Sequence, residues 1–135
     1  MAYLVPIISA FKNLEEANKK ERLTTPNRPS IIIVVPTKEL ANQLEDECKK
    51  LIHQAKFTVL SVNNSKVFMR EKKALDEGVD VLIGTPDRLE RHREKGTLFF
   101  SQVQYFVVDE ADTFLDSGYK DVIETYIRVF AQKQE

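Results

Sequence analysis

Four apolar runs recur along the chain and predict the strands of one sheet. Ile31–Val35 is a run of β-branched residues that ends at Pro36, and further apolar runs cover residues 57–62, 79–83 and 105–108. A strand exposed on one face alternates apolar and polar residues, whereas a run without polar interruptions is typical of a strand covered on both faces. The pattern therefore indicates a parallel sheet enclosed between helices.

Apolar residues at spacings of three and four predict amphipathic helices around these strands. The first helix has one apolar face, made by Leu4, Ile7, Ile8, Phe11 and Leu14. The second has a similar face, made by Leu40, Leu44, Cys48 and Leu51. Further helices are expected over residues 66–77, 85–95 and 121–132, with Gly96 ending the helix before it. Because strand and helix alternate four times without a two-residue hairpin, the predicted fold class is α/β, a three-layer parallel sheet with helices on both faces.

The composition narrows the class of protein. The 135 residues suit one domain, with 42% hydrophobic and 30% charged residues. No apolar run approaches the roughly 20 residues that cross a bilayer, and the first residues lack the basic leader of a signal peptide. The single cysteine, Cys48, excludes disulfides within the chain and multi-cysteine zinc sites, which favours an intracellular protein. With a formal net charge of −1, nucleic-acid contacts must come from local positive groups and helix ends.

Parallel α/β sheets bind ligands beyond the carboxyl ends of their strands, so the residue after each strand is a candidate. After the first strand, Thr37 is expected to cap the next helix and Lys38 to lie in its first turn. The N–H groups of a helix N-terminus bind phosphate. Read alone, however, capping is the simpler explanation of Thr37.

The segment after the third predicted strand also begins a helix. Thr85 followed by Pro86 is a strong helix start, and Asp87 suits the positive end of the helix dipole. Arg88 is placed to reach a phosphate or to pair with an acid such as Asp87. Read alone, this segment supports a structural role at least as well as a binding role.

Three carboxylates follow the fourth predicted strand, at Asp109, Glu110 and Asp112. Crowded like charges are unfavourable unless a cation or hydrogen-bond donors neutralise them. Mg²⁺ held by one or two carboxylates and by substrate phosphates is a common neutraliser. The alternative is an acidic helix start stabilised by the helix dipole.

Together these segments resemble the first core domain of the DEAD-box RNA helicases, a family with a RecA-like P-loop NTPase fold. Five stretches match in the order of the family: Ala2–Ile7, like the stretch after the phosphate-binding loop; Pro36–Ala41, like PTRELA; Thr85–Arg88, like TPGR; Val107–Asp112, like the namesake motif; and Phe114–Tyr119, like its usual continuation. Each stretch alone is a weak match, but five in order across nearly the whole chain are hard to obtain by chance.

The resemblance implies ATP and Mg²⁺ as cofactors and RNA as the partner. Asp109 would help to hold Mg²⁺ through water, Glu110 would position or activate the water that attacks the γ-phosphate, and Asp112 would link the nucleotide site to other motifs. Contacts with the RNA backbone are implied for Pro36, Thr37, Lys38, Asn63, Asn64, Thr85, Pro86, Asp87 and Arg88. The implied function of the parent protein is that of an ATP-dependent RNA helicase, which couples ATP binding and hydrolysis to RNA binding and duplex unwinding.

Several parts of that family's enzyme have no counterpart in the 135 residues. None of the four glycines lies in a G-x-x-x-x-G-K-[ST] sequence, so the P-loop is absent from this chain. The serine–threonine motif and the second helicase domain are absent as well. We therefore expect residues 1–135 to be a partial N-terminal RecA-like helicase domain, which alone neither hydrolyses ATP nor unwinds RNA.

Three departures from the family's motifs fall on the RNA side. Lys38 replaces an arginine and loses its bidentate fork, Asn63 and Asn64 replace a glycine pair, and Asp87 replaces the glycine of TPGR. The asparagine side chains are expected to hinder the approach of a phosphate, and the carboxylate of Asp87 to repel it. Each departure is expected to weaken RNA binding.

Other expectations concern assembly and competing functions. In the family, the missing strands lie beside the strand of residues 105–108, so this apolar edge is expected to drive self-association. His53 and His92 are expected at the surface. The alternatives to an enzyme fragment are a non-catalytic RNA- or protein-binding module derived from a helicase domain, a DNA-acting relative, and, more remotely, a metal-dependent hydrolase that uses Asp109, Glu110 and Asp112 without ATP.

Overall fold

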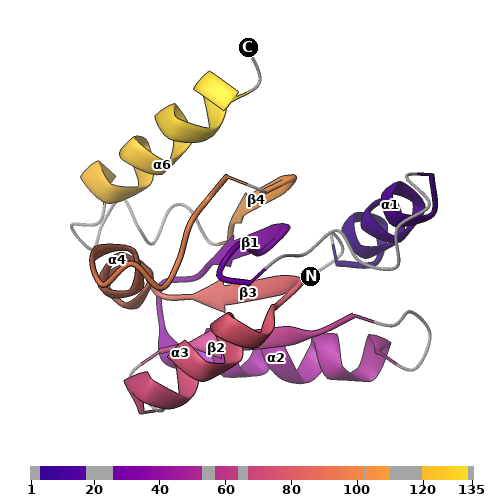
Figure 1. Cartoon of the computed structure of the whole chain (residues 1–135), viewed down its shortest axis with the longest axis horizontal. Helices are drawn as coiled ribbons and strands as arrows, with labels where there is room; N and C mark the ends of the chain where they lie inside the picture. Colours follow the sequence, from indigo (N-terminus) through magenta and orange to yellow (C-terminus); the bar gives the residue numbers. More distant parts are fainter. Residues whose placement is uncertain are drawn as a thin grey trace.

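The computed structural model of the chain describes residues 4–17, 26–52, 57–63, 67–101, 103–109 and 120–133. Four strands of four residues each form one sheet in the order β2-β3-β1-β4 (Figure 1). The strands are β1 Ile31–Val34, β2 Val59–Val62, β3 Val81–Gly84 and β4 Tyr105–Val108. Every pairing is parallel, as the alternation of strands and helices predicts.

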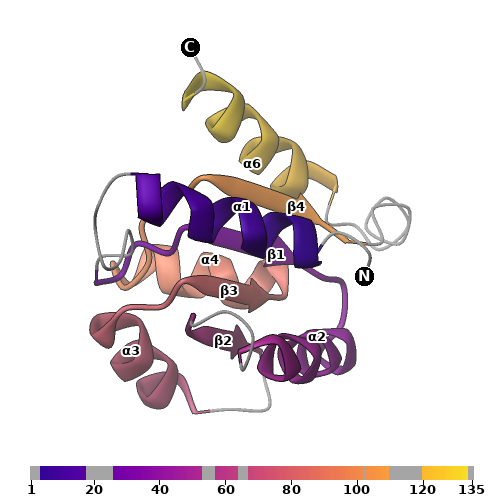
Figure 2. The ribbon, with the colours of Figure 1, turned by 90° about the vertical axis from the view of Figure 1, so that its right-hand side faces the viewer.

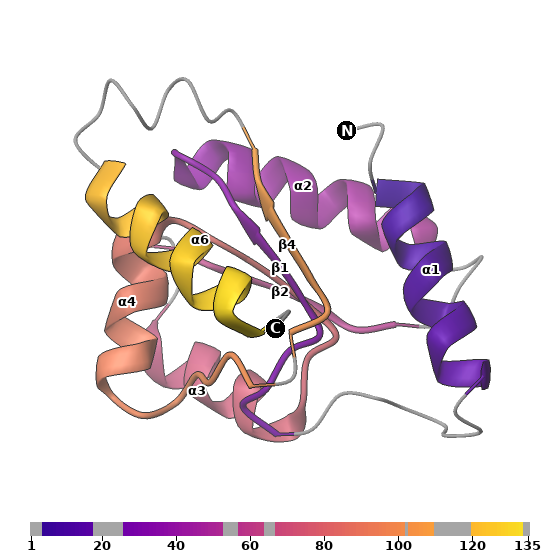
Figure 3. The same cartoon turned by 90° about the horizontal axis from the view of Figure 1, so that it is seen from above.

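Helices α1 (Leu4–Ala17) and α2 (Lys38–Leu51) cover one face of this sheet. Figure 3 shows both on the same side of the strands. Ile8 from α1 and the apolar stripe of α2 pack against alternate residues of β1 and β3. The residues of this layer that are almost fully buried include Ile8, Ile31, Ile33, Val35, Ala41, Leu44, Cys48, Phe57, Val81 and Ile83. The prediction that Cys48 is a small core residue is confirmed.

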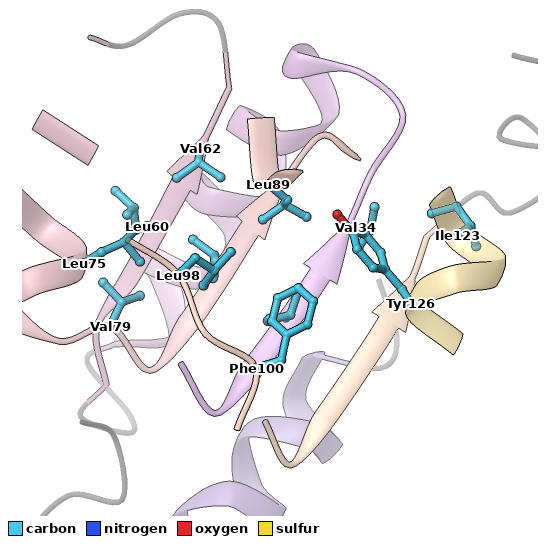
Figure 4. Close-up of a cluster of buried hydrophobic side chains, with 12 residues drawn as sticks. Val34, Leu60, Val62, Leu75, Val79, Leu89, Leu98, Phe100, Ile123 and Tyr126 are labelled. Atoms are coloured by element: carbon cyan, nitrogen blue, oxygen red, sulfur yellow. The ribbon is translucent and has the colours of Figure 1, made fainter. Parts of the chain in front are cut away.

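Helices α3 (Phe68–Glu77), α4 (Pro86–Glu94) and α6 (Lys120–Lys133) contribute to the opposite layer. Figure 2 shows α6 beside β4 at one side of the sheet and α3 near β2 at the other. Their buried side chains meet the other alternate residues of the strands, as Figure 4 shows for Leu75, Leu89 and Tyr126. The predicted three-layer α/β fold is therefore confirmed.

Polar side chains define where β2 and β3 begin. The apolar runs predict strands from residues 57 and 79, but both strands begin two residues later. Thr58 N donates to Asp80 Oδ2 at 2.9 Å, and Asp80 N donates to Thr58 Oγ1 at 3.0 Å. These side-chain bonds occupy backbone groups that would otherwise start the ladder, so Phe57 and Val79 serve the core rather than the sheet.

The two edge strands differ in how their outer sides are covered. On β2, carboxylates from neighbouring helices accept the outward N–H groups: Ser61 N donates to Glu45 Oε2 at 2.8 Å, and Asn63 N donates to Glu71 Oε2 at 3.0 Å. Among the described strands, β4 pairs only with β1 and forms the other edge. Carboxylates on an edge discourage pairing with another strand, so the β2 edge is the protected one. None of the described helices is long and apolar enough to cross a membrane.

Candidate functional site

The carboxyl ends of the four strands lie level with one another. Val34 pairs with Gly84 and with Val108, and Val62 also pairs with Gly84, so all four strands end at the same height. The residues that follow are therefore brought into one row along the edge of the sheet. In the order of the strands, this row is Asn63, Thr85, Val35 and Asp109. We call it the strand-end row.

Backbone hydrogen bonds continue beyond the strands and fix the strand-end row. Val35 N donates to Gly84 O at 3.0 Å, and Thr85 N donates to Val62 O at 3.4 Å. At the other end of the row, Asp109 N donates to Val34 O at 2.9 Å. These bonds fix the start of the DEAD segment and the starts of α2 and α4 relative to one another.

The start of α2 has the geometry that the sequence predicts. Thr37 is the N-cap, and its Oγ1 accepts a hydrogen bond from Leu40 N at 3.2 Å. Thr37 and Lys38 are both exposed at this helix end, and Pro36 is half-buried. A cationic side chain beside free helix N–H groups suits an anionic ligand such as a phosphate.

The start of α4 is less exposed. Thr85 occupies the N-cap position and Pro86 is the first helical residue, as predicted, but the Thr85 side chain makes no capping hydrogen bond. Thr85 and Pro86 are buried, whereas Asp87 is exposed in the first turn. The carboxylate of Asp87 is therefore the charge that a ligand meets at this helix end.

Arg88 pairs with an acid that the sequence does not suggest. Its Nε donates to Glu71 Oε1 at 2.9 Å, and its side chain is 13% exposed. Asp87, the acid named as an example in the sequence analysis, is the neighbouring residue and is exposed. The guanidinium also lies over the Phe68 ring, 5.5 Å from the centroid. Most of the Arg88 side chain is therefore engaged between α3 and α4.

Asn63 is buried at the end of β2. Its Nδ2 donates to Ser61 Oγ at 2.7 Å and to Asn42 Oδ1 at 3.2 Å. The expectation that this side chain hinders a phosphate is therefore wrong for Asn63, because the side chain points inward and is 0% exposed. Asn64, the second residue of the pair, lies outside the described residues.

His92 is part of a buried polar cluster, and its expected place at the surface is wrong. Its ring is 0% exposed and stacks on Phe68 with centroids 4.3 Å apart. Nε2 lies 2.9 Å from Glu71 Oε1, and Nδ1 lies 2.7 Å from Thr97 Oγ1. His92 is one turn after Arg88, so both face Glu71 from one side of α4. His53, expected at the surface too, lies outside the described residues.

Glu71 is the residue beside the candidate site that the sequence pattern most clearly misses. It is fully buried, and its two oxygens accept from Asn63, Arg88 and His92. A buried carboxylate is unfavourable unless donors and a positive charge surround it, and here both conditions hold. Because its partners are 8, 17 and 21 positions away in sequence, no local pattern marks this residue.

Of the DEAD segment, the structure describes Asp109 alone. Asp109 is half-buried directly after β4, at the carboxyl edge of the sheet. Glu110 and Asp112 lie outside the described residues. Within the described part of the chain, no three His, Cys, Asp or Glu side chains come together in a way that holds a metal ion.

Known proteins with similar sequences are helicases. The chain is 32% identical over 133 residues to DEAD-box ATP-dependent RNA helicase 39 of Arabidopsis thaliana, covering 98% of this chain and 21% of that protein. It is 35% identical over 123 residues to the pre-mRNA-splicing ATP-dependent RNA helicase prp-28 of Neurospora crassa, covering 89% of this chain and 16% of that protein. The chain thus spans about a fifth or less of the length of these relatives.

A solved structure and a family model agree with these sequences. The yeast DEAD-box splicing factor Prp28 superposes with a TM-score of 0.69 and 30% identity, covering 76% of this chain and 24% of that one. The model of the DEAD/DEAH box helicase family matches residues 1–135, the whole chain. The resemblance seen in the motifs is thereby confirmed, and the chain belongs to the DEAD/DEAH box helicase family.

Proposed function

We propose that residues 1–135 are part of the first RecA-like domain of an ATP-dependent RNA helicase, without the P-loop and the second helicase domain. In this role the chain supplies contacts to the RNA backbone at Pro36–Lys38 and Thr85–Arg88, and it supplies the carboxylates of the DEAD segment to the nucleotide. The observation that supports the proposal is the strand-end row, in which Val35, Thr85 and Asp109 lie at one edge of the sheet, at or next to the start of each segment. We also propose an intracellular location, as for a protein that acts on RNA.

The start of α2 supports the RNA half of this proposal. A capped helix end with exposed Lys38 is suited to hold a phosphate through backbone N–H groups and one positive charge. Such contacts position a nucleic acid but carry no base information. RNA binding by this chain is therefore expected to be independent of sequence and to weaken as salt concentration rises.

The nucleotide half rests on Asp109. Asp109 is a half-buried carboxylate at the carboxyl end of a strand. Such a group is suited to hold Mg²⁺ through water, which is its role in the proposed function. Bound with ATP, Mg²⁺ would neutralise the charge of the phosphates during phosphoryl transfer. In the same proposal Glu110 positions the attacking water and Asp112 links the nucleotide site to other motifs.

The RNA half is tested by fluorescence anisotropy with a labelled single-stranded RNA. Lys38→Ala removes one phosphate contact, so the slope of log affinity against log salt concentration should become shallower by about 0.7. The matched control is Lys95→Ala, because Lys95 is exposed at the opposite end of α4. Equal affinities and slopes for both variants would refute the assignment of the RNA-facing edge.

The nucleotide half of the proposal predicts that the isolated chain has no ATPase or unwinding activity. Because its 135 residues contain no P-loop, we expect the purified chain to show no RNA-stimulated ATP hydrolysis and no unwinding. Phosphate release is measured with and without RNA, with a complete DEAD-box helicase as the positive control. RNA-stimulated hydrolysis by the chain alone would overturn this expectation.

The same chain is expected to self-associate through β4. This strand forms one edge of the described sheet, and its four residues are apolar or aromatic. The β2 edge is blocked by Glu45 and Glu71, so association through that side is disfavoured. Size-exclusion chromatography with light scattering checks this, and a monomer at high concentration would contradict it.

The second candidate function is a non-catalytic module that binds RNA or protein. It is favoured by one observation, that Asp87 stands exposed at the start of α4 where an RNA phosphate would otherwise approach. Salt-sensitive RNA binding is expected both of the helicase role and of an RNA-binding module, whereas salt-independent capture of a protein ligand without RNA binding would favour a protein-binding module.

A further inference from the structure

A continuous chain of hydrogen bonds crosses the candidate RNA-binding edge from α2 to α4. Asn42 of α2 accepts from the Asn63 side chain, and Asn63 N donates to Glu71. Glu71 of α3 in turn accepts from Arg88 Nε in α4. We call these four residues, Asn42, Asn63, Glu71 and Arg88, the polar tie. They connect the two helices whose first turns are the proposed phosphate contacts.

We propose that the polar tie is a positioning device, which fixes the spacing of the α2 and α4 N-termini so that both bind the backbone of one RNA strand. This inference rests on the proposed RNA-binding function and deepens it. Asn42, Asn63 and Glu71 act through the helices rather than by touching RNA, whereas Arg88 also belongs to the proposed RNA-contact segment Thr85–Arg88. Asn63 and Glu71 are 0% exposed, and the Arg88 side chain is 13% exposed. Buried groups of this kind hold neighbouring elements in place instead of meeting a ligand.

Glu71 is the centre of the polar tie. One oxygen accepts from Asn63 N at 3.0 Å, and the other accepts from Arg88 Nε at 2.9 Å. The loop after β2 and the first turn of α4 are thus joined through a single carboxylate. Charge-assisted hydrogen bonds in a buried setting are strong and geometrically restrictive, so the join limits relative movement.

Asn63 extends the polar tie to the other helix. Its side chain reaches Asn42 in the second turn of α2, only one turn after Lys38. A glycine at position 63 has no side chain with which to make this bond. The asparagine, which departs from the glycine of the family's motif, therefore links α2 to the loop that Glu71 fixes.

Two sites on one rigid frame bind a shared ligand better than two independent sites. The second contact is then intramolecular, and its contribution depends on whether the spacing of the sites matches the ligand. Loosening the polar tie should therefore weaken binding only for an RNA long enough to reach both helix ends. An RNA that occupies one helix end should be insensitive. This length dependence separates positioning from simple loss of folded protein.

The test measures the affinity of the chain for single-stranded oligouridylates of increasing length. Glu71→Gln and Asn42→Ala are each expected to lower affinity for long oligomers by about tenfold, with little effect on the shortest ones that bind. Since both variants break the same tie, the double variant should be no worse than the more affected single variant. Asn42 is half-buried on α2, so Asn42→Ala keeps the test valid if Glu71→Gln does not fold.

The matched control is Glu45→Gln. Glu45 is also a buried carboxylate that accepts a β2 N–H, from Ser61, but it contacts neither Asn63 nor Arg88 in the bonds described above. Its loss should lower stability in the same way and leave RNA affinity at every length unchanged. If Glu45→Gln and Glu71→Gln weaken RNA binding alike, the polar tie has no positioning role.

These measurements distinguish a failure of the positioning role from a failure of RNA binding itself. If the unmodified chain binds no RNA of any length, the proposed RNA-binding function fails, and the positioning role fails with it. If the chain binds RNA and Glu71→Gln binds long oligomers as tightly, only the positioning role is refuted. A length-dependent loss in Glu71→Gln and Asn42→Ala, absent from Glu45→Gln, supports both.

Discussion

Gly84 is the position where one added methyl group should disturb the candidate site most. It ends β3 and directly precedes Thr85, in the middle of the sheet. A Cβ at this position would lie 2.7 Å from Val62 Cγ2 and 2.9 Å from both Leu89 Cγ and Leu89 Cδ2. Val62 and Leu89 are both 0% exposed and pack in the same core cluster, so neither side chain can move aside into solvent.

The size of the effect follows from those distances. Ordinary contacts of a Cβ begin at 3.4 Å, so β2 and α4 must each retreat by roughly half an ångström or more. Overpacking of this kind typically costs about 1–3 kcal/mol. Because two packed elements must move at once, we expect Gly84→Ala to lower the free energy of unfolding by about 2–3 kcal/mol. With a urea m-value of about 2 kcal/mol/M, the unfolding midpoint should fall by about 1–1.5 M.

Urea unfolding followed by far-UV circular dichroism measures this change. Val62→Ala removes the methyl group that the new Cβ meets, so the double variant should be more stable than the sum of the two single changes by about 1 kcal/mol. Gly96→Ala is the control: nothing lies within 4 Å of its added Cβ, but its φ of +74° is strained for alanine. Its cost should therefore be independent of Val62. Wild-type stability of Gly84→Ala, or additivity with Val62→Ala, would refute the packing argument.

Two further predictions concern charge and protons. Asp87→Gly should raise RNA affinity severalfold at matched salt because it removes an exposed carboxylate from the start of α4, and unchanged affinity would argue against repulsion. Burial, with smaller contributions from Glu45 and Glu47, raises the pKa of the Cys48 thiol from 9.0 to about 11. The unfolded thiol therefore ionises first, so unfolding free energy should decline between pH 9 and 11 in the native chain but less in Cys48→Ala.

The sheet was predictable because its signal is local. Each strand is a short apolar run whose side chains are needed on both faces, and this requirement appears directly in the sequence of β1 and β3. The starts of β2 and β3 were less predictable. There the reciprocal bonds between Thr58 and Asp80 decide where the ladder begins, and those residues are 22 positions apart.

The start of α2 and the place of Asp109 were also predictable, since both follow from residues next to a strand. The polar cluster around Glu71 was not. A glutamate in a charged helix such as α3 ordinarily faces solvent, and a histidine within α4 gives no sign of burial. Only the fold brings Glu71 opposite Arg88 and His92, and only then does each polar group acquire a partner that makes its burial favourable.

The strand-end row divides the candidate site into two halves with different physical character. Asp109 lies at one end of the row, beside β1, and its position depends on the backbone bond to Val34. Asn63 and Thr85 lie at the other end, where the buried carboxylate of Glu71 joins the surrounding elements. Because Asn63 also bonds to Asn42, the half proposed to face RNA is anchored on α2, which packs against β1 in the middle of the row.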